Sequence, residues 1–317
     1  MISRSQWVLV SVIAASAVLS SFSGRIDDYV LDVTIGVGIN IMLAVSLNLI
    51  NGYTGQFSLG HAGFMAVGAY TAGALTTNLG PQIVATLGGG RAATTFLFAG
   101  ALLSGGLLAA FAGFLVGVPS LRLKGDYLAI VTLGFGEIIK VIIQNINWLG
   151  GSRGMVGIPP YTNLFWTFTM AALSVYVVIS LIHSSYGRGF IAVSDDEVAA
   201  EAMGINTTRY KITAFVIGAF FAGIAGGIYG HFKQFITPTG FDFTRSIEIV
   251  VMVILGGMGN TVGVILAAVL LTVLPEFLRS VAEYRMIIYS LLIIVIMLTR
   301  PQGLFTWSRR TPPVAAK

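Results

Sequence analysis

The chain has 317 residues, of which 56 % are hydrophobic and only 10 % are charged, and its formal net charge is +5. A soluble domain carries about a quarter charged residues, so the composition excludes a soluble enzyme, a disordered chain and a fibrous repeat. It predicts an all-α polytopic membrane protein, with residues 1–317 forming one transmembrane domain. The chain has no Cys, which excludes disulfides and thiolate metal sites.

Apolar segments follow one another along the chain, and a membrane-spanning helix needs about 20 such residues. We expect ten segments, at 7–22, 30–50, 58–78, 94–118, 127–148, 165–183, 212–232, 247–255, 262–274 and 285–299. The first resembles a secretory signal, but we expect it to be a retained helix because further hydrophobic segments follow. The short eighth and ninth segments flank a glycine-rich stretch and predict a broken or re-entrant pair, so the bundle has about eight to ten spans.

Basic residues predict the orientation. With a cytoplasmic amino terminus, more Lys and Arg fall on the inside than on the outside, as topology favours. The pair Arg122 and Lys124 and the basic tail at 300–317 contribute most to this bias. We therefore expect both termini, and the polar loop at 184–211, to be cytoplasmic. Because topology accounts for the positive charge, we expect no nucleic-acid partner.

The loop at 184–211 has the pattern of a short helix. Ser194 and Glu197 fit a capping box, with Ser194 as N-cap and with Asp195 and Asp196 in the first turn. Small and apolar residues follow at helical spacing, and Gly204 is a typical stop. The candidate docking residues after the cap are Ala199, Ala200, Ala202, Met203 and Gly204. We expect either a helix that packs on the bundle or a dock for a cytoplasmic partner, whose groove would close around the small side chains.

Five sequence stretches, in this order, closely resemble the LivM-type permeases of branched-chain amino acid ABC transporters. They are NLINGYTGQFSLGHAGF at 48–64, GDYLAIVTLGFGE at 125–137, the segment 145–159 with GGSRG at 150–154, the loop from GRGF at 187–190 to EAMGI at 201–205, and LGGMGN at 255–260. Within the loop, the resemblance adds Arg188 and Phe190 to the coupling residues. Val198 stands where importers of this kind usually have Glu, and no Leu-Pro follows, so the loop departs from the general pattern.

The resemblance implies a permease of the bacterial inner membrane that imports leucine, isoleucine, valine or related amino acids. It implies as partners a second, LivH-type permease, two LivG/LivF-type ATP-binding subunits and an extracytoplasmic binding protein. ATP would be bound by those subunits, because this chain lacks the phosphate-binding Gly-rich motif. We expect no cofactor and no enzymatic activity of its own.

Polar residues inside the apolar segments are candidates for a translocation pathway, because a charge in mid-membrane needs a partner or a wet cavity. They are Asn48, Gln56, His61, Glu137, Lys140 and Glu248. The alternative is structural: His61 would bond between helices, and Glu137 with Lys140 would form an i, i+3 pair. Metal-ligand spacing is absent from the sequence, so we expect no metal site.

Two other functions remain open. A permease of the same family could carry urea or short amides, since selectivity resides largely in the external binding protein. A self-contained secondary transporter or channel would have no need of a cytoplasmic dock, so the loop at 184–211 favours the importer.

Overall fold

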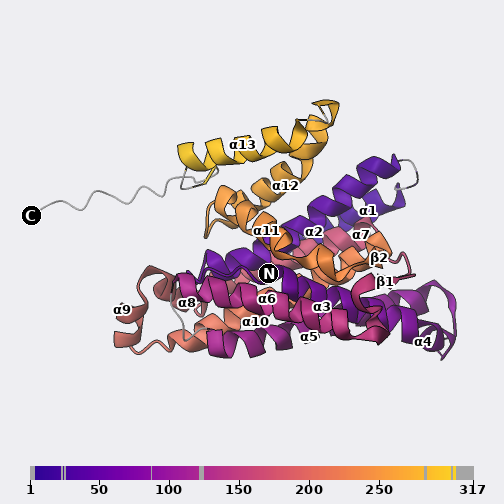
Figure 1. Ribbon diagram of the computed structural model, residues 1–317, viewed down its shortest axis with the longest axis horizontal. Helices are drawn as coiled ribbons and strands as arrows, with labels where there is room; N and C mark the ends of the chain where they lie inside the picture. Colours follow the sequence, from indigo (N-terminus) through magenta and orange to yellow (C-terminus); the bar gives the residue numbers. More distant parts are fainter. Residues whose placement is uncertain are drawn as a thin grey trace, which may run out of the picture.

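The structure is a computed structural model that describes residues 4–22, 24, 26–86, 88–120, 125–281, 284–300 and 303–304. The described chain is almost entirely helical, and its long helices run along one elongated bundle (Figure 1). This confirms the all-α prediction. Arg122 and Lys124 lie outside the described residues, as does the predicted basic tail apart from residues 300, 303 and 304.

The first half of the bundle contains α1 (Arg4–Ser21), α2 (Asp28–Asn51), α3 (His61–Ala74), a π-helical turn (Leu75–Leu79), α4 (Gly80–Thr86), α5 (Gly90–Ser120) and α6 (Asp126–Asn145). The second half contains α7 (Leu164–Ile182), α8 (Gly187–Asp195), α9 (Glu197–Ala202), α10 (Thr207–Lys233), α11 (Phe243–Gly256), α12 (Thr261–Phe277) and α13 (Arg285–Thr299). Short 3-10 turns occupy Asn147–Leu149, Gly151–Arg153, Pro238–Phe241 and Leu278–Val281. Strands β1 (Met155–Val156) and β2 (Phe235–Ile236) pair antiparallel, with Met155 opposite Ile236.

Asn and Asp side chains begin many of these helices. Each accepts a hydrogen bond from a backbone N–H of the first turn, where no intrahelical acceptor exists. The caps of α2, α7, α10, α11 and α12 are Asp27, Asn163, Asn206, Asp242 and Asn260. A polar residue directly before an apolar run is therefore what sets these helix starts.

Five of the described helices, α2, α5, α6, α7 and α10, are long and apolar enough to cross a membrane by themselves. The chain is therefore a multi-pass membrane protein. Helices α3 and α11 have only 14 residues each and α12 has 17, so at about 1.5 Å per residue they are shorter than the hydrocarbon layer. The count of eight to ten spans stays a prediction.

Glycines allow α3, α5 and α10 to cross closely. A Cβ atom at Gly68 of α3 would lie 2.0 Å from the Gly223 carbonyl oxygen of α10, and one at Gly105 of α5 would lie 2.8 Å from the Gly68 oxygen. Any side chain at these positions would separate the helices. Small residues at a helix crossing are typical of membrane proteins, because they let the backbones approach closely.

The two ends of the bundle differ. Helices α8 and α9 lie at one end, and α4 lies with β1 and β2 at the other (Figure 1). We call these the α8–α9 end and the β1–β2 end. The chain after α13 returns to the α8–α9 end, because the Leu304 N–H donates to the Leu255 carbonyl in the last turn of α11 at 2.8 Å. Which end faces the cytoplasm stays a prediction.

Candidate functional site

The loop at 184–211 forms two short helices rather than one. Helix α8 continues through Ser194 to Asp195, and α9 begins at Glu197. The cap between them is Asp196, whose Oδ1 accepts hydrogen bonds from the N–H groups of Val198 and Ala199 at 2.9 and 3.0 Å. The prediction of Ser194 as N-cap is therefore wrong, as is the placement of Asp195 in the first turn of the docking helix.

The physical reason lies in the residues before the cap. Phe190 and Val193 are buried at helical spacing, and this apolar pair holds Ser194 and Asp195 within α8. Asp196 is the first residue with extended backbone, at φ −156° and ψ 109°. Its ionised oxygen is also a stronger acceptor than a serine hydroxyl.

Gly204 ends α9, as predicted. It has φ +83°, a conformation that favours glycine. Its N–H donates to the Glu201 carbonyl at 2.9 Å, and the Ile205 N–H donates to the Ala200 carbonyl at 3.0 Å. These two bonds form a Schellman motif. Helix α9 therefore has a defined end as well as a defined start.

The outer surface of α9 is uncovered and mostly apolar, with Glu201 as its exposed charged residue. Val198 is 68 % exposed and Met203 is 83 % exposed, and Ala199 and Ala202 are exposed beside them. Ala200 is buried, so it packs on the bundle and does not belong to this surface. We call Val198, Ala199, Ala202 and Met203 the α9 surface.

Aromatic packing anchors α8. Phe190 is fully buried, and its ring centroid lies 5.4 Å from those of both Tyr186 and Tyr210. Tyr186 and Tyr210 are stacked at 4.5 Å. Tyr210 belongs to the first turn of α10, so the cluster joins α8 to a long bundle helix. Arg188 is exposed on the opposite side of α8.

A buried ion pair anchors α9. The Lys211 ammonium of α10 lies 2.6 Å from Glu197 Oε1, and the Lys211 side chain is only 1 % exposed while that of Glu197 is 22 % exposed. Thr207 also donates to Glu201 Oε1 at 2.7 Å. Sequence reasoning assigned Glu197 to a capping box and missed Lys211. The available signal was a lone lysine at the start of an apolar run.

The loop after α2, which contains Gly52 and Gly55, meets the glycine-rich stretch between α11 and α12 at this end of the bundle. The Gly259 N–H, between α11 and α12, donates to Asn48 Oδ1 of α2 at 2.9 Å. A Cβ atom at Gly52 would lie 2.2 Å from the Gly259 nitrogen, and one at Gly55 would lie 3.3 Å from Ser194 Oγ. We call these contacts among residues 48–56, residue 194 and residues 256–260 the glycine joint. It links α8 to α2 and to the α11–α12 hairpin.

The predicted pathway residues do not form one group. Asn48 and Gln56 are buried in and beside the glycine joint, where Gln56 Nε2 donates to the Thr54 carbonyl at 3.2 Å. His61 is fully buried, and its Nε2 lies 2.8 Å from Ser46 Oγ of α2. The alternative prediction, that His61 bonds between helices, is therefore confirmed. Asn48 and His61 therefore connect separate elements, whereas Gln56 bonds within its own loop.

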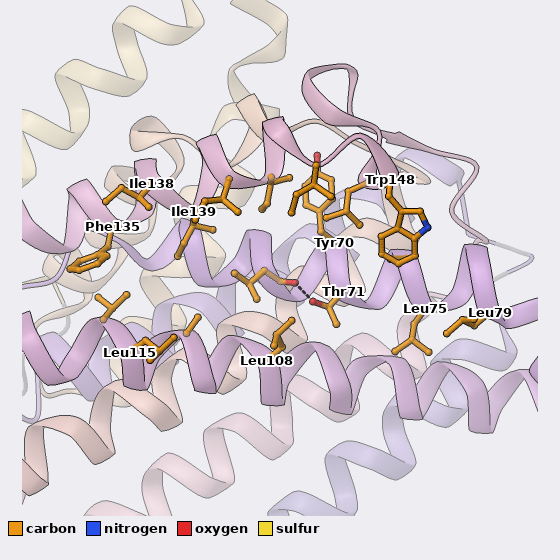
Figure 2. Close-up of a pocket in the computed structure, with 18 residues that line it drawn as sticks. Tyr70, Thr71, Leu75, Leu79, Leu108, Leu115, Phe135, Ile138, Ile139 and Trp148 are labelled. Carbon is orange, nitrogen blue, oxygen red and sulfur yellow. Dashed lines mark hydrogen bonds between the residues drawn. The ribbon is translucent and has the colours of Figure 1, made fainter.

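Glu137 and Lys140 form the expected ion pair on α6, and their side chains are 42 % and 19 % exposed. Only 22 % of the apolar stretch of α6 is buried. An apolar groove of about 630 Å³ lies between α6, α3 and α5, lined by Phe135, Ile138, Leu108, Leu115 and others (Figure 2). The pair therefore sits on a helix whose outer side the rest of the chain leaves uncovered.

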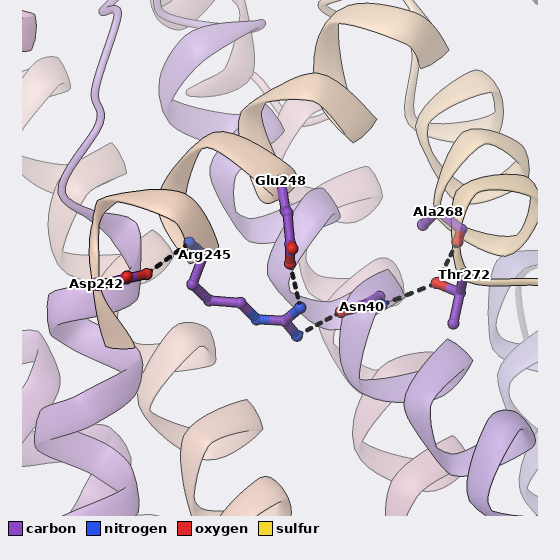
Figure 3. Close-up of polar contacts among 6 residues, drawn as sticks. All are labelled: Asn40, Asp242, Arg245, Glu248, Ala268 and Thr272. Carbon is purple, nitrogen blue, oxygen red and sulfur yellow. Dashed lines mark hydrogen bonds and ion pairs between the residues drawn. The ribbon is translucent and has the colours of Figure 1, made fainter. Parts of the chain in front are cut away.

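Glu248 belongs to a polar chain that ties three helices together. Arg245 of α11 donates to Glu248 Oε2 and to Asn40 Oδ1 of α2, both at 2.8 Å (Figure 3). Asn40 Nδ2 donates in turn to Thr272 Oγ1 of α12 at 2.8 Å, and Thr272 donates to the Ala268 carbonyl at 2.6 Å. Because arginine has only donors, this order fixes the orientation of the Asn40 amide.

Among the described residues, no group of three His, Asp or Glu side chains could hold a metal ion.

The chain matches known proteins over most of its length. It is 37 % identical over 306 residues to the high-affinity branched-chain amino acid transport system permease protein LivM of Salmonella typhimurium, covering 86 % of this chain and 68 % of that protein. It is 27 % identical over 328 residues to a probable LivM of Methanocaldococcus jannaschii, covering 88 % and 94 %.

A shorter similarity reaches the LivH permease protein of Salmonella typhimurium, at 29 % identity over 179 residues, covering 55 % of this chain and 57 % of that protein. No solved structure matches the chain. Residues 29–297 match the family model described as branched-chain amino acid transport system / permease component. A match over this much of the sequence shows that the chain belongs to the family of branched-chain amino acid transport permeases.

Proposed function

We propose that the chain is the membrane-spanning permease subunit of an ATP-binding-cassette importer for leucine, isoleucine, valine or related amino acids. The observation that carries the proposal is the α9 surface: a short helix, capped at both ends and anchored to the bundle, presents exposed small and apolar side chains at one end of a membrane protein. Apolar side chains gathered on an exposed surface indicate a binding partner. The names of the related permeases support the substrate class.

The partners follow from the same proposal. A second permease of LivH type would complete the translocation pathway. Two ATP-binding subunits of LivG and LivF type would bind and hydrolyse ATP at the α8–α9 end, so that end would face the cytoplasm. An extracytoplasmic binding protein would deliver substrate to the β1–β2 end. This chain would itself hold no ATP and no cofactor.

The anchors suggest how closure of the ATP-binding subunits would reach the membrane helices. A force on α9 acts on α10 through Glu197 and Lys211, because the buried ammonium has no access to water as a substitute partner. A force on α8 acts on the glycine joint through the contact of Ser194 with Gly55. Both routes are short and closely packed, so a small displacement outside the bundle would shift α2, α10 and the α11–α12 hairpin together.

Two substitutions on the α9 surface test the docking role. Ala199→Arg and Ala202→Arg each add bulk and charge where a groove would close, while Ala92→Arg makes the same change at an exposed alanine of α5 near the opposite end. In the assembled importer, we expect the first two variants to insert normally but to uncouple ATP hydrolysis from leucine uptake. The control should transport normally.

Normal uptake by both α9 variants would remove the assignment of the dock. Uptake that follows a proton or sodium gradient, and that survives an inactivating mutation in the ATP-binding subunits, would instead favour a secondary transporter. Labelling that places residues 195–203 outside the cell would contradict the proposed orientation.

A further inference from the structure

A small cavity with charges of both signs lies near the β1–β2 end of the bundle. It has a volume of about 160 Å³ and lies between α2, α10 and α11. Its lining includes a carboxylate, two cations and an amide together with apolar side chains, namely Asp32, Lys233, Arg245, Asn40, Ile39 and Phe232.

The charged groups are paired but not enclosed. Lys233 Nζ lies 2.9 Å from Asp32 Oδ1, and these side chains are 41 % and 51 % exposed. Arg245 donates to Glu248 at 2.8 Å, and these side chains are 22 % and 46 % exposed. Partly exposed pairs of this kind contribute little to stability. A new ion can therefore replace one partner at small cost.

The polar chain of Figure 3 fixes one of the cations. Arg245 is held through Asn40 and Thr272 to the backbone of α12. Its backbone N–H also donates to Asp242, the cap of α11, at 3.2 Å. The guanidinium is thereby positioned before any ligand arrives, and a planar guanidinium suits recognition of a carboxylate.

Two cations beside an apolar surface can bind a carboxylate and an aliphatic chain, and the neighbouring carboxylates can bind an ammonium. A free amino acid with an aliphatic side chain carries all three groups. A plain carboxylic acid or a plain amine carries only two of them.

We propose that this cavity is a binding site for a zwitterionic aliphatic amino acid. The ligand's carboxylate binds Arg245 and Lys233 in place of Glu248 and Asp32. Its ammonium binds the carboxylates so released, of which Asp32 lines the cavity. Its side chain packs on Ile39 and Phe232. The inference deepens the proposed function and rests on it: the site would receive the substrate at the end where a binding protein delivers it.

Photo-crosslinking tests the site directly. The full chain in lipid nanodiscs is irradiated with the diazirine analogue of leucine, and adducts are mapped by mass spectrometry. We expect adducts at Ile39, Phe232 or neighbouring lining residues. Excess L-leucine should suppress them, whereas 4-methylpentanoate and 3-methylbutylamine at the same concentration should suppress them far less. Adducts confined to other places, such as the groove of Figure 2, or equal suppression by all three competitors, would overturn the proposal.

Variants that each remove one positive charge test which cations bind the ligand's carboxylate. Arg245→Gln and Lys233→Gln should each lower adduct yield about tenfold, the effect expected from losing a charge-assisted hydrogen bond. Arg153→Gln removes the same charge from an exposed position near β1 and should leave the yield unchanged. If Arg245→Gln fails to fold, the adduct yield of Lys233→Gln and the competition experiment on the unaltered chain still test the proposed site.

The proposed function and the proposed binding site can be tested independently of each other. ATP-dependent leucine uptake by the assembled importer tests it without reference to this cavity. Uptake with no adducts in the cavity would reject only the binding site. Adducts in the cavity without ATP-dependent uptake would reject the importer and leave an amino acid site in a different kind of transporter.

Discussion

The ion pair between Glu197 and Lys211 should respond very differently to loss of either partner. Glu197→Gln leaves the Lys211 ammonium in a site where it is only 1 % exposed. Lys211→Met leaves the Glu197 carboxylate, which is 22 % exposed and can turn towards water. The double variant leaves no charge. The buried ammonium should therefore make Glu197→Gln the most damaging of the three changes.

The magnitude follows from burial. Removing one partner of a buried pair costs about 3–5 kcal/mol, and we take about 3 kcal/mol for Glu197→Gln because its carboxylate is partly hydrated. For Lys211→Met we expect about 1 kcal/mol, because the remaining charge keeps access to water. At about 1.4 kcal/mol for each factor of ten, the first change raises the ratio of undocked to docked α9 roughly a hundredfold. The double variant should resemble Lys211→Met alone.

Hydrogen exchange measures this ratio. The amides of α9 should exchange faster by about two orders of magnitude in Glu197→Gln and by less than one in the other two variants. Amides in the middle of α10 report global unfolding and should not change. Equal effects of the two single changes, or a double variant as labile as Glu197→Gln, would refute the reasoning that an isolated buried ammonium is the source of the cost.

Three further changes test the local geometry. Asp196→Ala should destabilise α9 by about 1 kcal/mol and speed its amide exchange, whereas Ser194→Ala should not, and the opposite order would restore Ser194 as the cap. Gly52→Ala should lower the melting temperature and the yield of monodisperse protein. The backbone angles at residue 52 suit alanine, but the added Cβ atom has no room. The control Gly100→Ala, whose Cβ atom would meet nothing within 4 Å, should be neutral or stabilising. Glu137→Ala leaves a lysine unpaired on α6 and should lower the yield of folded protein, and an unchanged yield would mean that this lysine reaches water.

The long helices were predictable because their signal is local. An apolar run of about 20 residues has few other stable forms in a membrane, and α2, α5, α7 and α10 overlap the predicted spans closely. The span count was not, because a helix of 14 residues such as α3 or α11 depends on its neighbours for its position in the bilayer.

The site was predicted in outline but not in its contacts. The end of α9 at Gly204 follows from the local backbone preference of glycine, and the structure confirms it. The choice of Asp196 over Ser194 as cap depends on the burial of Phe190 and Val193, which is a tertiary effect. The pairing of Glu197 with Lys211 joins residues 14 positions apart, for which the spacing of a single helix gives no signal.

The contrast between two lysines of α10 connects these observations. Lys211, at the α8–α9 end, is 1 % exposed, and Lys233, at the β1–β2 end, is 41 % exposed, yet each forms an ion pair with another helix. A buried pair has no competing partner in water, so it keeps its contact while the helices move and can transmit a displacement. An exposed pair exchanges partners at little cost, so it can release a carboxylate and accept one from a ligand. One helix thus places a fixed contact at the end proposed for coupling and an exchangeable contact at the end proposed for substrate entry.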